Sequence, residues 1–155
     1  MAKIRGLLVA LTGTAFGLSP ATLPSQESVA PADGRALVTI KELMEKTITP
    51  ATNTLWNVPE APTDEEWAAL EEAAVTLLAA ATVTALGGTG PKDNEWAKQP
   101  AWTAFNGVMI SAGRDALDAI RARNVDALLG AGDVLYPPCE GCHLQFNPGV
   151  VDAAQ

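Results

Sequence analysis

The chain has 155 residues, enough for one domain with a substantial hydrophobic core. It is rich in alanine and poor in aromatic residues and in β-branched runs, which favours helices over sheet. The formal net charge of −8 disfavours nucleic acid and anionic membranes as partners and suits a basic partner protein. The same acidity also serves solubility, so both interpretations stay open.

Residues 1–21 have the pattern of a secretory signal peptide. Lys3 and Arg5 form a positively charged start, and the apolar run from Gly6 to Phe16 is too short to span a bilayer. Small residues follow, so we expect cleavage between about residues 17 and 30. The signal predicts export to the periplasm, and the alternative is an uncleaved membrane anchor.

The rest of the chain divides into three parts. Residues 22–34 are rich in proline, serine and alanine, which is typical of a flexible lead-in. Residues 35–147 carry helical patterns and are expected to form the folded domain. Residues 148–155 make a short C-terminal tail.

The first helix is expected from about Arg35 to Trp56. Pro50 lies inside this stretch and lacks a backbone N–H, so it predicts a kink near Lys46 or Thr47. The apolar residues recur with helical spacing on one face. They are Leu37, Ile40, Met44, Ile48, Ala51 and Leu55.

A capping box of Thr63 and Glu66 predicts the start of the second helix, and Gly87-Gly88 predicts its end. The apolar stripe between them follows helical spacing. It consists of Trp67, Leu70, Ala74, Leu77, Leu78, Ala81 and Ala85.

Two further helices complete the predicted domain. Pro100 suits the first position of the third helix, and Asn124 can cap the fourth. Pro137-Pro138 must interrupt or kink the fourth helix, after which Pro138 can open a fresh turn that runs to Phe146. The third helix carries an apolar stripe of Trp102, Phe105, Met109, Ala112, Ala116 and Ile120.

The fourth helix contains Cys139-Glu140-Gly141-Cys142-His143, which has both cysteines and the single histidine of the chain. Cys-x-x-Cys-His is the pattern of c-type haem attachment. Two cysteines three positions apart lie on one helical face, about one turn apart, and can form thioethers with two porphyrin vinyl groups. His143 then reaches the iron as the proximal ligand. We therefore expect one covalent haem c, attached through Cys139 and Cys142.

Three other interpretations of this motif stay open. A redox dithiol of thioredoxin type needs a preceding strand and a βαβ frame, and no such pattern is visible. Half of a zinc site needs further Cys or His ligands, and the sequence has none. The third interpretation is a chance match.

Four amphipathic helices with Cys-x-x-Cys-His near the C-terminus resemble the cytochrome c′ family and its low-spin relatives. Ordinary small cytochromes c carry this motif near the N-terminus, so its late position also favours the bundle family. The resemblance implies an all-α fold, an up-down-up-down antiparallel four-helix bundle. It depends on four residues, which are Met44, Cys139, Cys142 and His143.

The resemblance places the first helix over the distal face of the haem. Low-spin members of the family use a Met of this helix as the sixth iron ligand, whereas cytochrome c′ leaves that position open behind an apolar side chain. Met44 suits either arrangement, and it can also be an ordinary core residue. Met109 on the third helix is the other internal candidate.

Two functions follow from these two arrangements. A haem held by His143 and Met44 implies electron transfer with a redox partner protein. A five-coordinate haem implies binding of a small gas ligand, NO or CO, behind a screen that includes Ile40 and Ile48. A peroxidase-like enzyme would need a second acid–base group on the distal side. The only histidine is already used, so we expect no enzymatic activity.

The chain departs from the family pattern in two places. The family often has a basic residue where this chain has Ile40, and its last helix usually runs unbroken into the haem motif, which Pro137-Pro138 precede here. Trp96, in the connection before the third helix, either packs as a lid over the helix ends or lines the haem edge. The resemblance also leaves a homodimer open, because bundle cytochromes often pair through their first two helices.

Overall fold

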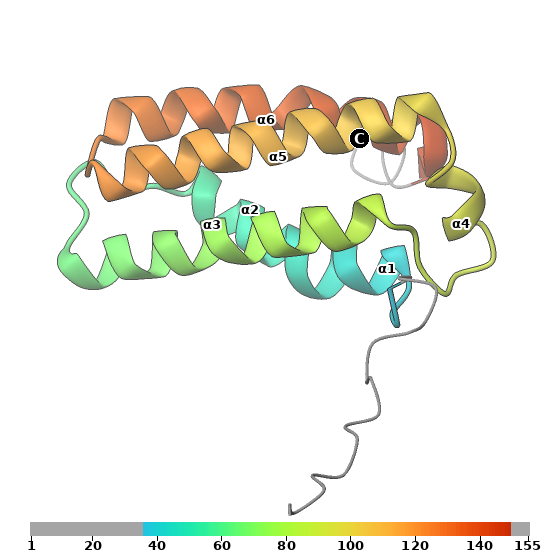
Figure 1. The fold of residues 1–155 in the computed structure, drawn as a ribbon. Helices are drawn as coiled ribbons and strands as arrows, with labels where there is room; N and C mark the ends of the chain where they lie inside the picture. Colours follow the sequence, from blue (N-terminus) through green and yellow to red (C-terminus); the bar gives the residue numbers. More distant parts are fainter. Residues whose placement is uncertain (1–35, 150–155) are drawn as a thin grey trace, which may run out of the picture.

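The computed structural model describes residues 36–149, which are all-helical, with no strand among them (Figure 1). The predicted signal peptide and lead-in lie outside the described residues, as does most of the C-terminal tail. The elements in chain order are α1 (Ile40–Leu43), η1 (Met44–Ile48), α2 (Thr49–Trp56), α3 (Asp64–Ala85), α4 (Asp93–Trp96), α5 (Pro100–Arg121) and α6 (Val125–Phe146).

Four helical stretches lie along one another. The elements α1, η1 and α2 follow without a break and act as the first stretch, and α3, α5 and α6 are the other three. Helix α5 packs against both α6 and α3, α3 packs against α2 and η1, and α2 also touches α6. Figure 1 shows α5 and α6 side by side, with α3 and the first stretch on the opposite side. This arrangement is compatible with the four-helix bundle expected from the sequence.

The first helix begins at Ile40, so the prediction of a start at Arg35 is wrong. Thr39 is the N-cap, and its hydroxyl accepts a hydrogen bond from the Glu42 N–H at 3.0 Å. The Glu42 carboxylate in turn accepts from the Thr39 N–H at 2.8 Å. This capping box provides acceptors for backbone N–H groups that have no partner within the helix because they lie at its start. Leu37 consequently lies outside the helix and is 70% exposed.

Pro50 disturbs the first helix where the sequence predicted, and the disturbance takes the form of a π-helical turn. This turn, η1, is centred on Lys46. In an ordinary α-helix the ring of Pro50 would clash with the Lys46 carbonyl, four positions earlier. The Thr49 N–H reaches back to the Met44 carbonyl, one residue further than in an α-helix. The wider turn therefore begins at Met44, the predicted distal residue.

The second helix is α3, and its predicted capping box is confirmed. Thr63 accepts from the Glu66 N–H, and the Glu66 carboxylate accepts from the Thr63 N–H at 2.7 Å. Gly87, just past the helix end, has φ of +93°, a conformation that favours glycine. By length and composition alone α3 could cross a membrane, but the core helix of a soluble protein passes the same test. Its Ala74 and Leu77 are fully buried in the core.

The fourth helix, α6, runs without interruption through Pro137 and Pro138, so of the predicted interruption or kink the interruption is wrong. The two prolines leave the carbonyls of Asp133 and Val134 without their usual N–H partners. Both of these residues are exposed, and water can bond the freed carbonyls. The motif residues therefore belong to one continuous helix that begins at the Asn124 cap, whose side chain accepts from the Ala127 N–H at 3.0 Å.

A buried aspartate ties the connection after α3 to the start of the first helix. Asp93 is 4% exposed, and its Oδ2 accepts from the Ile40 N–H and the Gly90 N–H, both at 2.8 Å. A Cβ added to Gly88 would lie 2.5 Å from the same oxygen. Asp93 thus holds the connection close to the N-terminus of α1, where a negative charge also suits the helix dipole.

Replacement of Asp93 by Ala should destabilise the protein by about 1–3 kcal/mol, because two buried N–H groups lose their acceptor. Chemical denaturation of the purified protein measures this change. Glu95→Ala, an exposed change on the same short helix, is the matched control and should have little effect. Equal stability of the two variants would contradict the role given to Asp93.

Candidate haem site

The last two turns of α6 present Cys139, Cys142 and His143, and all three are partly buried. Neither thiol is in a disulfide. The Cys139 Sγ lies 3.2 Å from the Leu135 carbonyl, to which it donates. Because the helix is continuous, the two cysteines lie one turn apart on a common face, as the attachment pattern requires.

Burial determines the protonation of the side chains of Cys139, Cys142 and His143. It raises the pKa of the Cys139 thiol to about 11. Burial, and then the neighbouring Cys139, raise the pKa of Cys142 to about 11. Burial also lowers the pKa of His143, so its imidazole is neutral and able to bind a metal near neutral pH. Both thiols are therefore protonated at neutral pH.

These surroundings weaken the redox-dithiol interpretation of the motif. Reactive dithiols have a thiol pKa that is lowered by a helix N-terminus or a nearby cation, whereas these two are raised. The motif also lies near the C-terminus of a long helix and not after a strand. The zinc interpretation lacks ligands, because no group of three His, Cys, Asp or Glu side chains suited to a metal exists among residues 36–149.

Two pockets meet at the motif, between the first helical stretch and α6. The smaller has a volume of about 330 Å³ and the larger about 800 Å³. Both volumes lie within the range of small-molecule and cofactor pockets, ~300–1,000 Å³. The residues that line both pockets are Met44, Thr49, Cys142 and His143.

The structure therefore brings the predicted site residues to one place. Met44 lines the same space as Cys142 and His143, although about a hundred positions separate them in the sequence. Cys139 lines the smaller pocket only. Met109, the other candidate, also lines the smaller pocket and is 6% exposed.

The smaller pocket has mainly apolar walls. Two buried polar side chains also contribute to it, Thr52 and Asn106, each 3% exposed. The Thr52 hydroxyl donates to the Ile48 carbonyl at 3.0 Å. The apolar lining comes from Met44, Ile48, Trp56, Phe105, Met109 and Pro138.

Gly141, between the two cysteines, allows α6 to approach α5 closely. A Cβ at this position would lie 2.8 Å from Cε1 of Phe105, too close for an ordinary contact. Further along the same pair of helices, the rings of Trp102 and Phe146 meet edge to face at 5.1 Å. These two contacts fix the antiparallel register of α5 against the haem motif.

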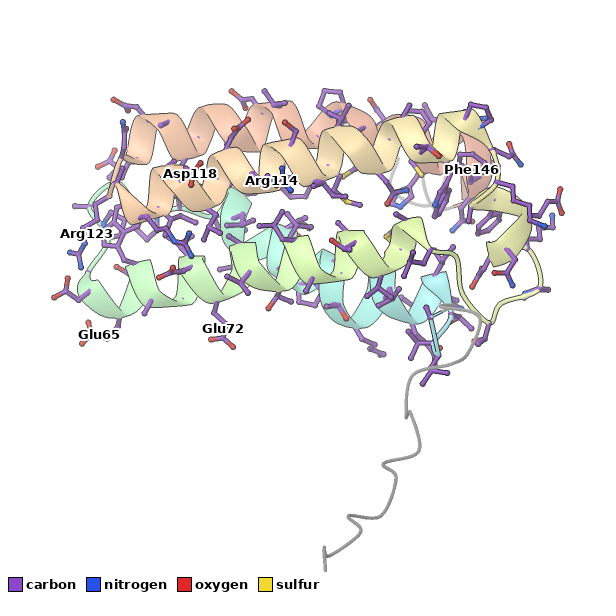
Figure 2. All side chains as sticks on the ribbon, in the orientation of Figure 1. Glu65, Glu72, Arg114, Asp118, Arg123 and Phe146 are labelled. Carbon is purple, nitrogen blue, oxygen red and sulfur yellow. The ribbon has the colours of Figure 1, made fainter. Side chains whose placement is uncertain are left out.

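An aromatic cluster closes the end of the larger pocket. The rings of Trp96 and Trp102 stack at 5.8 Å, and both contact Phe146, which Figure 2 shows on α6 at the end of the molecule near α4. All three residues line the larger pocket. Trp96 therefore packs over the helix ends, and it also lines the larger pocket, so the prediction that it lines a haem edge stays a prediction.

The opposite end of the molecule carries much of the charge. Figure 2 shows Glu65, Glu72, Asp118 and Arg123 away from the end that carries Phe146. Arg123 pairs there with Asp64 at 2.6 Å, and both side chains are exposed. Exposed pairs of this kind contribute little to stability, at most about 1 kcal/mol. The candidate site is thus set apart from this charged end.

No family model, curated protein or solved structure matches this chain.

The assignment of the site therefore rests on its residues. Two thiols and one imidazole on a helix face a pocket with apolar walls and a thioether, and this donor set suits a covalent haem. Sequence reasoning missed Thr52 and Asn106. Asn106 could have been found, because it follows Trp102 by four positions on the buried face of the third helix and is the polar residue there.

Gly141→Ala should destabilise the protein by about 1–3 kcal/mol, because the added methyl group meets the Phe105 ring. Gly130→Ala, on the same helix with open space around it, should instead stabilise by about 0.5–1 kcal/mol. Denaturant titration of the two variants measures both changes. A Gly141→Ala protein as stable as Gly130→Ala would contradict the close approach of α5 and α6.

Proposed function

We propose that this protein is an exported, periplasmic c-type cytochrome that transfers electrons through one covalently attached haem. The observation that carries the proposal is that Cys142, His143 and Met44 line both pockets and Cys139 lines the smaller one. The arrangement of helices supports an up-down-up-down four-helix bundle of the cytochrome c′ type. Haem, when bound, supplies one-electron redox chemistry.

The chain's own residues hold and shield the group. Cys139 and Cys142 fix it to α6, and His143 supplies the proximal imidazole. The apolar walls of the smaller pocket exclude water from the iron, and the aromatic cluster of Trp96, Trp102 and Phe146 covers the other side. Lys41 and Lys92 line the larger pocket and offer positive charge to the haem carboxylates.

Met44 serves as the distal ligand in this proposal. It is the first residue of the π turn, and turns of this kind occur frequently at functional sites. Its neighbours on the inward face, Ile40 and Ile48, are each 4% exposed, so the thioether is the soft donor that this stretch presents to the pocket. A thioether ligand raises the reduction potential, which suits electron transfer.

The second candidate function is the binding of NO or CO by a five-coordinate haem. The observation that favours it is the room on both sides of Met44, which lines both pockets. In that case Met44, Ile40 and Ile48 form an apolar screen that admits small gases. The protein is then a gas-binding protein and not an electron carrier.

Loss of both thiols should abolish covalent attachment. We expect wild-type protein from a periplasmic expression host to keep its haem on a denaturing gel, whereas Cys139→Ser combined with Cys142→Ser should release it. Met44→Ala is the control and should keep the haem on the gel, because its side chain makes no covalent bond. Release of haem from the denatured wild type would overturn the proposal.

Met44→Ala should convert low-spin iron to high-spin iron, lower the reduction potential and open a site for CO. Absorption spectroscopy and potentiometric titration measure these changes. Met109→Ala is the matched control, since it removes a thioether from the same smaller pocket, and it should leave the spin state unchanged. Wild-type protein that is already high-spin and binds CO rapidly would favour the gas-binding function.

A further inference from the structure

Asn106 on α5 has a buried oxygen without a partner. Its Nδ2 donates to the Trp102 carbonyl at 2.9 Å, which fixes the direction of the amide. Its Oδ1 is buried and accepts no hydrogen bond, and no other described side chain has a buried nitrogen or oxygen in this condition. An unsatisfied buried acceptor costs about 1–3 kcal/mol, so the orphaned oxygen calls for an explanation.

The position of Asn106 suggests its partner. It lines the smaller pocket together with Cys142 and His143. The contacts of Trp102 with Phe146 and of Phe105 with Gly141 set α5 antiparallel to α6. This register puts Asn106 level with Glu140 to Cys142 of α6, immediately before His143.

The chemistry of a metal-bound histidine supplies the missing donor. A histidine that binds a metal through one ring nitrogen almost always donates its other N–H to an acceptor. No hydrogen bond joins the His143 ring to another side chain or carbonyl within residues 36–149. The pocket therefore contains Asn106 Oδ1, an acceptor without a donor, and the His143 ring, whose N–H has no acceptor.

We propose that Asn106 Oδ1 accepts a hydrogen bond from Nδ1–H of His143 when the Nε2 of His143 binds haem iron. This inference rests on the proposed haem function. Asn106 is then a positioning residue that fixes the orientation and tautomer of the imidazole. The hydrogen bond makes the imidazole a stronger donor to iron and favours the ferric state. It lowers the reduction potential, in opposition to the effect of Met44.

Two substitutions and one control test this role. Asn106→Leu removes the acceptor and keeps the branching of the side chain, and Asn106→Asp replaces the acceptor with a stronger one. Thr84→Val is the control, because Thr84 is buried, its hydroxyl already donates to the Ala80 carbonyl at 2.8 Å, and it lines neither pocket. Each protein is purified with its haem, and haem content, reduction potential and the exchange rate of the His143 ring N–H are measured.

The reduction potential should rise in Asn106→Leu, fall in Asn106→Asp and stay near the wild-type value in Thr84→Val. The His143 Nδ1–H, followed by nitrogen-15 NMR of the reduced protein under CO, should exchange slowly in wild type and rapidly in Asn106→Leu. If Asn106→Leu does not fold, Asn106→Asp alone tests the shift in potential. If the Asn106 variants carry covalent haem with an unchanged potential, the role of Asn106 is overturned but the proposed function is not. If the wild type carries no covalent haem, both the proposed function and this inference are overturned.

Discussion

The close approach of α6 to α5 at Gly141 is the contact on which the position of the candidate site depends. The glycine lies between the two cysteines, so the residue that permits the contact is part of the attachment motif itself. A side chain there would meet the Phe105 ring, so either the ring or the part of α6 that carries Cys139 and Cys142 would have to move. Packing therefore constrains the same five residues to which we assign haem attachment.

The first helical stretch lines the pockets from the side opposite α6. Pro50 cannot continue an ordinary α-helix, and the chain accommodates it with a wider turn that begins at Met44. The Thr39 cap and the buried Asp93 carboxylate fix the start of this stretch. A helix whose start is held and whose middle is widened presents Met44 toward the space that His143 also lines.

Local signals predicted much of the fold. The Thr63 capping box, Pro100 and Asn124 each mark a helix start that depends only on neighbouring residues. The Thr39 box has the same pattern but was missed, because apolar spacing from Leu37 onward also fits a helix. Pro137-Pro138 did not interrupt the helix, because the freed carbonyls belong to exposed residues and can bond water, and exposure cannot be read from the dipeptide.

The remaining features depend on contacts between distant residues. Asp93 accepts a hydrogen bond from the Ile40 N–H, 53 positions earlier in the chain, and no local sequence pattern predicts such a bond. The attachment motif was evident from the sequence, whereas the pockets that unite it with Met44 required the packed helices. The unsatisfied oxygen of Asn106 likewise depends on the packed helices, which bury it without a donor.

X-ray absorption at the iron edge of the purified, oxidised protein tests the central claim most directly. The account predicts one iron per chain, bound by four porphyrin nitrogens, the imidazole nitrogen of His143 and a sulfur from Met44. The sulfur signal should disappear in Met44→Ala and persist in Met109→Ala. The protein should be made in a host that can attach haem. Protein from that host would contradict the account if it contained no iron, or if its iron were not bound by porphyrin nitrogens.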